Sequence, residues 1–93
     1  MTLRRFVIAR DIPKVGSLDR EQLRGAAQKS NEVIGQLAPD IQWVESYVAA
    51  NMTFCVCLAK DEGVIRKHAE ISGFPATTIT AITRVIDPTT ALD

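Results

Sequence analysis

The middle of the chain reads IQWVESYVAANMTFCVCLA over residues 41–59, and this stretch decides the fold. It contains two runs of strand-forming residues, 41–49 and 52–59, which are joined by a tight connection at Ala50 and Asn51. Two adjacent strands with so short a connection must pair antiparallel. The stretch therefore predicts a β-hairpin at the centre of the chain.

The segment before this hairpin predicts one strand and one helix. Residues 5–10 are a β-branched and aromatic run that ends at turn residues, which is typical of a strand. Apolar residues then recur at helical spacing from Leu18 to about Leu37, and Ser17 or Asp19 offers the N-cap. The first half of the chain is thus a strand followed by a helix.

The segment after the hairpin repeats this pair in reverse order. Asp61 can cap a second helix, which the residues Ser72 and Gly73 end, and residues 79–86 alternate as a last strand. The order strand, helix, strand, strand, helix, strand is the ferredoxin-like βαββαβ unit. The predicted class is therefore α+β, a four-stranded antiparallel sheet with two helices on one face.

The length and the cysteines indicate one small intracellular domain. With 93 residues and no internal linker, residues 1–93 are expected to form a single ferredoxin-like domain. Its N-terminal apolar run is interrupted by Arg10 and Asp11 and lacks a small-residue cleavage site, so no export is implied. Free thiols at Cys55 and Cys57 suit the reducing cytosol. We therefore expect a cytoplasmic protein.

Both faces of the predicted hairpin carry apolar residues. One alternating set contains Trp43, Tyr47, Cys55 and Cys57, and the other contains Val44, Val48, Phe54, Val56 and Leu58. The helices can cover only one face, so a second subunit packed sheet to sheet would cover the other. This predicts a homodimer of the dimeric α+β barrel type. The alternative is a monomer with an exposed, partly polar sheet.

Charge and motifs exclude several classes of function. Eleven basic and eleven acidic residues cancel, so no global field favours nucleic acid or an anionic membrane. The apolar runs are well below the ~20 residues that span a bilayer. The chain contains no G-x-G-x-x-G, no P-loop and no G-x-S-x-G. We therefore expect neither nucleic acid nor membrane as a partner.

His68 is the single histidine and the first candidate site residue. It shares a helical stripe with Val64 and Ile71, which predicts that it points toward the sheet or its edge. Imidazole titrates near neutral pH and is the commonest ligand for borderline metals. The structural alternative is a core histidine that is hydrogen-bonded to a backbone carbonyl.

Trp43, Glu45 and Tyr47 are predicted to share one face of the strand that begins the hairpin. A carboxylate in such apolar surroundings would have its pKa raised by desolvation, which suits general acid or base chemistry. The alternative is that the strand lies at a sheet edge or dimer rim and that Glu45 is solvated. Both interpretations stay open at this stage.

The pair Cys55 and Cys57 offers soft ligands on one face of a strand. A thiolate, an imidazole and a carboxylate together make a plausible nickel or zinc set, here Cys57, His68 and Glu45. Metal sites more often place two residues between such cysteines. The alternative is that at least one of the two packs as a small apolar residue.

Four blocks of the sequence carry a resemblance to a known family. They are QWVESYV (42–48), TFCVC (53–57), HAEISGFPA (68–76) and VIDPTT (85–90). Over nearly its whole length the chain resembles a family of small bacterial proteins that is often labelled nickel-binding. The resemblance implies a ferredoxin-like subunit, a dimer and, for at least one member, a bound nickel ion. His68, in the helix block, is the residue to which it assigns a ligand role.

Three functions remain for the predicted domain. The first is a small dimeric binding protein for a divalent transition metal such as nickel, or for a small ligand, with Trp43, Glu45, Tyr47, Cys57 and His68 lining one cleft. The second is a cofactor-free isomerase or monooxygenase of the dimeric α+β barrel class, acting on a small organic substrate. The third is a structural or regulatory protein whose sheet face binds a partner. Whether the protein is an enzyme stays open.

Overall fold

All six predicted elements are present in the structure, a computed structural model that describes residues 2–92. In chain order, the elements are β1 (Arg4–Asp11), the 3-10 helix η1 (Val15–Ser17), α1 (Arg20–Leu37), β2 (Ile41–Val48), β3 (Met52–Ala59), α2 (Glu62–Ser72), β4 (Thr78–Ala81) and the 3-10 helix η2 (Pro88–Leu92). The α+β ferredoxin-like fold is confirmed. Within residues 2–92, no helix is long and apolar enough to cross a membrane.

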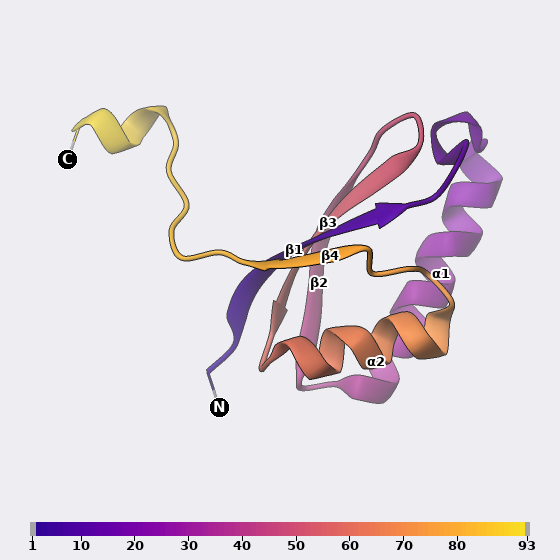
Figure 1. Cartoon of the computed structure of the whole chain (residues 1–93), viewed down its shortest axis with the longest axis horizontal. Coiled ribbons are helices and arrows are strands. Elements are labelled where there is room, and N and C mark those ends of the chain that lie inside the picture. Colours follow the sequence, from indigo (N-terminus) through magenta and orange to yellow (C-terminus); the bar gives the residue numbers. More distant parts are fainter. Residues whose placement is uncertain (1, 93) are drawn as a thin grey trace.

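The four strands form one antiparallel sheet in the order β2-β3-β1-β4. Figure 1 shows α1 and α2 on the same side of this sheet. We call the face toward the helices the inner face and the opposite one the open face. Phe6 pairs with Cys57 and Ile8 with Cys55. Because directly paired residues point to the same side and Phe6 is buried, both cysteines lie on the inner face, as predicted.

Local hydrogen bonds set the helix ends. The Asp19 carboxylate accepts a hydrogen bond from the Gln22 backbone N–H at 2.8 Å, and the Gln22 side chain accepts one from the Asp19 N–H at 3.0 Å. This capping box starts α1 at Arg20, two residues later than predicted. Asp61 caps α2 through the Val64 N–H at 3.0 Å, and Gly73, with a φ of 81°, ends it.

The apolar core lies on the inner face, between the sheet and α2. Its buried members are Phe6, Ile8, Ile41, Cys57, Ala59, Val64 and Ile65. The sheet contributes most of them, and α2 supplies Val64 and Ile65. α1 contributes one buried residue, Val33, and its other apolar residues are partly buried or exposed.

A β-bulge in β2 corrects the predicted alternation of the hairpin. Trp43 pairs with Cys57 and Glu45 with Val56, so two neighbouring residues of β3 face three positions of β2. The extra residue, Val44, shifts the pleat by one position. Trp43 therefore lies on the inner face with Cys57, whereas Glu45 lies on the open face. The prediction that Trp43 and Glu45 share a face is wrong.

The last strand is shorter than predicted. β4 spans only Thr78–Ala81 and not residues 79–86. It is an edge strand whose single partner is β1, with Phe6 opposite Ala81 and one further hydrogen bond from the Ile82 N–H to the Arg5 carbonyl at 2.9 Å. β1 begins at Arg4, so no partner backbone remains for the following residues. They extend away from the sheet (Figure 1).

Candidate functional site

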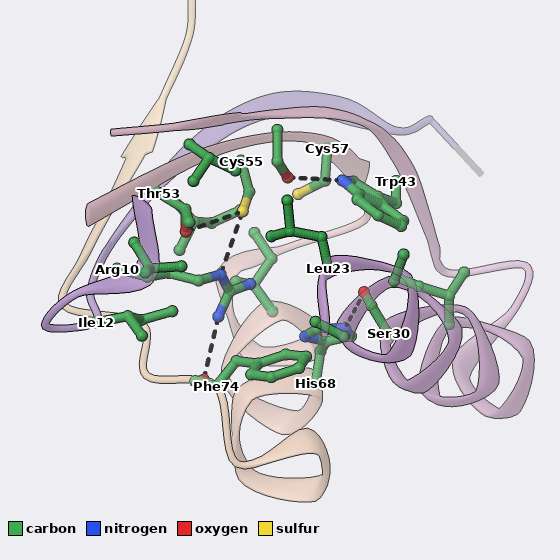
Figure 2. A pocket seen from close by; sticks show the side chains of 18 of the residues that line it. Arg10, Ile12, Leu23, Ser30, Trp43, Thr53, Cys55, Cys57, His68 and Phe74 are labelled. Atoms are coloured by element: carbon green, nitrogen blue, oxygen red, sulfur yellow. Dashed lines mark hydrogen bonds between the residues drawn. The ribbon is translucent and has the colours of Figure 1, made fainter. Parts of the chain in front are cut away.

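A cavity of about 250 Å³ lies between the inner face of the sheet and the two helices. Its apolar wall includes Ile8, Trp43 and Ile65 together with α1 residues such as Leu23. Leu23 and Val48 line the cavity and are also 36% and 46% exposed to solvent, which places its mouth between the start of α1 and the end of β2. Figure 2 shows the polar side chains that project into this space.

Arg10 is the charged residue of the cavity wall. It continues the inner-face alternation of Phe6 and Ile8 on β1 and is only 6% exposed. Its Nη1 donates to the carbonyls of Phe74 at 3.1 Å and Pro75 at 3.0 Å, and its Nε donates to the Sγ of Cys55 at 3.4 Å. The chain that leaves α2 after Gly73 thus holds the guanidinium in place.

His68 lies on α2 at the other side of the cavity and is 3% exposed. Its Nε2 and the Ser30 hydroxyl of α1 are 3.2 Å apart, within hydrogen-bond distance. Burial and, to a smaller extent, the charge of Arg10 lower the pKa of His68, the contact with Ser30 opposes them, and the net result is a pKa of about 4. His68 is therefore neutral at neutral pH, and its Nδ1 is buried without a hydrogen-bond partner among residues 2–92.

The low basicity of His68 bears on the enzyme alternative. A general base works best when its pKa is near the working pH. An imidazole with a pKa of about 4 holds a proton poorly in neutral solution. If the protein were an enzyme of the predicted barrel class, His68 would therefore be a poor choice for the group that moves a proton.

The two cysteines line the cavity, but their environments differ. Cys57 is buried, and this burial raises the pKa of its thiol to about 11 in spite of the opposing charge of Arg10. It is therefore a protonated thiol at neutral pH, as expected for a packing residue. Cys55 is less buried and contacts Arg10 and the Thr53 hydroxyl, the latter at 3.7 Å.

Trp43 lies in the cavity, where its indole Nε1 donates to the Ser46 hydroxyl across the bulge at 2.9 Å. Glu45 and Tyr47 lie on the open face, exposed and hydrogen-bonded to each other. This bond, together with the Glu45 charge, raises the pKa of Tyr47. The predicted cleft is therefore corrected: Trp43, Cys57 and His68 come together, whereas Glu45 and Tyr47 are on the other side of the sheet.

The cavity residues do not form a nickel site by themselves. Within residues 2–92, no three carboxylate, imidazole or thiol side chains are grouped so as to hold a metal ion. Glu45 is separated from His68 and Cys57 by the sheet, the Cys57 thiol is protonated, and Arg10 places a positive charge beside both. The donor set proposed from the sequence therefore does not fit a cation in this chain.

Sequence reasoning missed Arg10, Ser30 and Thr53 as members of the site. Arg10 could have been found, because it follows Phe6 and Ile8 at a spacing of two residues and so belongs on the face that those residues bury. Thr53 is likewise on the Cys55 and Cys57 face. Ser30 carries no comparable signal, since its partner His68 is 38 residues away.

Comparison with known proteins places this chain in a family. The family described as "Nickel responsive protein SCO4226-like" matches residues 6–82. The chain belongs to this family. The match covers both helices and all four strands from Phe6 on, so it includes the whole cavity.

A solved structure shows the same fold. It is the crystal structure of SCO4226 from Streptomyces coelicolor A3(2), which matches with a TM-score of 0.74 and 14% sequence identity. The match covers 88% of this chain and 99% of that chain. The comparison with curated proteins gave no match. The SCO4226-like family assignment and the ferredoxin-like fold thus stand on independent comparisons of sequence and of structure.

Proposed function

We propose that this protein is a small-ligand-binding protein whose ligand occupies the cavity between the sheet and the helices. The supporting observation is an apolar space of about 250 Å³ in which Arg10, His68 and Thr53 are buried. Apolar cavities with a few polar groups are the usual form of small-molecule sites. Residues of the sheet and of both helices line the cavity, so it is a property of the fold and not a packing defect of one side chain.

A thermal-shift screen of small organic compounds tests this proposal, because a ligand of the folded state raises the melting temperature. Ala27 lines the cavity from α1, and Ala27→Leu fills part of it. Gln28→Leu is the matched control, since Gln28 is the next residue and is exposed. A compound that stabilises the wild type and Gln28→Leu, but not Ala27→Leu, supports the proposal. Equal stabilisation of both variants places the ligand elsewhere and contradicts it.

Nickel binding is the second candidate, because the SCO4226-like family is described as nickel responsive. In this chain a nickel ion would need donors beyond the cavity set, for example from a second subunit. Calorimetric titration of nickel into chelator-treated protein tests the candidate. If His68 is a ligand, the heat of binding disappears in His68→Ala. Unchanged heat in that variant removes His68 from the metal site.

The open face of the sheet supports a homodimer as the functional unit. Its register places Val7, Tyr47, Phe54, Val56 and Leu58 on one side. Tyr47 is 58% exposed and Phe54 is also exposed. Exposed apolar patches on soluble proteins commonly mark interaction surfaces. A second copy packed on this face would form the dimeric α+β barrel predicted from the sequence.

Sedimentation equilibrium tests the homodimer. Phe54→Glu places a charge on the open face, beside Tyr47, and is expected to shift the protein to monomer. Gln42→Glu, a conservative change on the same face, is the control and should leave the association unchanged. A wild-type protein that sediments as a monomer at all accessible concentrations contradicts the proposal.

A further inference from the structure

The guanidinium of Arg10 is a buried positive charge that has no carboxylate partner among residues 2–92. The side chain is 6% exposed. The two salt bridges among residues 2–92 are Lys60 with Asp40 and Arg66 with Glu62, and neither includes Arg10. A buried charge is costly unless it is paired. Arg10 is thus a group whose counter-charge none of the described residues 2–92 supplies.

The hydrogen bonds of Arg10 leave one end of its guanidinium free. Nε donates to Cys55, and Nη1 donates to the carbonyls of Phe74 and Pro75, which uses the single proton of Nε and both protons of Nη1. Within the described part of the chain, no hydrogen bond involves Nη2. Figure 2 shows the side chain reaching across the cavity between Cys55 and Phe74. The group is therefore held rigidly with unused donors.

The other titratable groups of the cavity do not neutralise Arg10. His68 is neutral and the thiol of Cys57 is protonated. Glu45, a carboxylate of strand β2, is on the open face and is hydrogen-bonded to Tyr47. The cavity therefore carries a net positive charge, which favours an anion and disfavours a cation.

The size and lining of the cavity restrict the rest of the ligand. Its volume is about 250 Å³, and apart from its few polar groups the wall is apolar, with Ile8, Leu23, Ile34 and Ile65 among its residues. A cavity of roughly 150 Å³ accepts benzene. The space beside Arg10 therefore suits a single ring, or a branched aliphatic group of similar size, together with one small polar group.

We propose that the cavity binds a small monocarboxylate with an aromatic or branched aliphatic body, with its carboxylate on Nη2 of Arg10. A carboxylate accepts hydrogen bonds from a guanidinium and supplies the missing counter-charge. This proposal rests on the proposed function, in which the cavity is a ligand site. It goes further by naming the ligand class and the residue that selects it.

Benzoate and its uncharged counterpart benzamide are the probes. Trp43, the single tryptophan of the chain, lines the cavity, so its fluorescence reports occupancy. Benzoate is expected to bind the wild type at least about 10-fold more tightly than benzamide, as for a hydrogen bond to a charged group. This comparison needs no variant and does not depend on how a variant folds.

Arg10→Met is expected to weaken benzoate binding about 10- to 100-fold and to leave benzamide binding unchanged. Arg10→Lys keeps the charge and should recover part of the affinity for benzoate. Arg5→Met is the matched control, because Arg5 is on the same strand but faces the open side. It should bind both probes as the wild type does.

The outcomes separate the two proposals. Equal binding of benzoate and benzamide, unaffected by Arg10→Met, would overturn the carboxylate assignment while the cavity remains a ligand site. Loss of benzoate binding in Arg5→Met as well as in Arg10→Met would also overturn it, because the effect would then be one of overall charge. If neither benzoate nor benzamide binds and no compound of the thermal-shift screen does, both proposals fail.

Discussion

The two helices cover the same face of the sheet but pack against it very differently. In α2, Val64, Ile65, His68 and Ser72 are buried within 11 residues, whereas α1 buries only Val33 within 18 residues. The apolar residues of α1 instead border the cavity, as Leu23 and Ile34 do. From this difference we expect the buried residues of α2 to contribute more to the stability of the fold than the residues of α1 that border the cavity.

The buried polar side chains are also distributed unevenly between the apolar core and the cavity. Where α2 meets the sheet away from the cavity, the core is apolar and contains Phe6, Ala59 and Val64. Arg10, Thr53 and His68 are buried where the sheet, the end of α2 and α1 surround the cavity. Buried polar groups cost stability unless they are satisfied, and their concentration beside an unfilled space is the arrangement on which the proposed ligand site rests.

The largest loss of stability is expected for a substitution of a buried residue of α2. Ile65 is fully buried, so Ile65→Ala is expected to lower the free energy of unfolding by about 2–5 kcal/mol. Leu23→Ala, at the cavity mouth on α1, should cost roughly 1 kcal/mol or less, because this side chain already borders open space. Urea denaturation measures both. Equal losses would mean that α1 packs as firmly as α2 and would break the comparison.

Acid is expected to lower the stability of the fold through His68, which lies on α2 and lines the cavity. The pKa of His68 is lowered from 6.5 to about 4 in the folded state. As the pH falls below about 6.5, the unfolded chain binds this proton first, so stability should fall from about pH 6.5 to about pH 4 and change no further below it. The contribution is up to roughly 3 kcal/mol.

Unfolding curves at several pH values measure this loss. Carboxylates also titrate in this range, so the informative quantity is the difference in slope between the wild type and His68→Gln. The slope of the variant should be shallower between pH 6.5 and pH 4. Parallel slopes would show that His68 is not desolvated as described.

Removing a helix N-cap is expected to lower the stability by a smaller amount, and the two caps together test whether α2 contributes more to stability than α1. Asp61→Ala removes the N-cap of α2 and should cost about 0.5–2 kcal/mol of global stability. Asp19→Ala removes the capping box of α1. Since the first turns of α1 are weakly packed, its main effect should be faster hydrogen exchange there, with less change in global unfolding. A larger global loss for Asp19→Ala would reverse the assignment of stability to α2.

The smallest effect is expected on the open face. Tyr47→Phe removes the hydrogen bond to Glu45, but both side chains are exposed. The free energy of unfolding of the monomer should change by less than about 0.5 kcal/mol. Denaturation at low protein concentration measures it. A loss above about 1 kcal/mol would indicate that this pair is part of the folded core.

Much of the fold was predictable because its signals are local. The capping residues Asp19 and Asp61, the αL residue Gly73 and the short hairpin connection each act within a few residues, and all of them are confirmed. The length of the last strand was not predictable in this way. It ends because β1, a segment more than 70 residues away in the chain, offers no further backbone to pair.

The candidate site was predicted only in part. Trp43, Cys57 and His68 do border one cavity, because their sequence periods put them on the faces that pack together. Glu45 and Tyr47 do not, because one extra residue at Val44 reverses the alternation of β2 after Trp43. Nothing in the local sequence distinguishes a bulged strand from a regular one, since the bulge is defined by pairing with β3.

The sequence by itself determined the order of the elements, the starts and ends of the helices, and the antiparallel hairpin, since each depends on neighbours along the chain. Tertiary structure alone decided which side chains share the cavity. The register of β2 on β3 places Glu45 on the open face, and the packing of α1 and α2 over the inner face leaves a cavity beside Arg10 and His68. Both depend on contacts between distant segments, which exist only once the sheet and helices have packed.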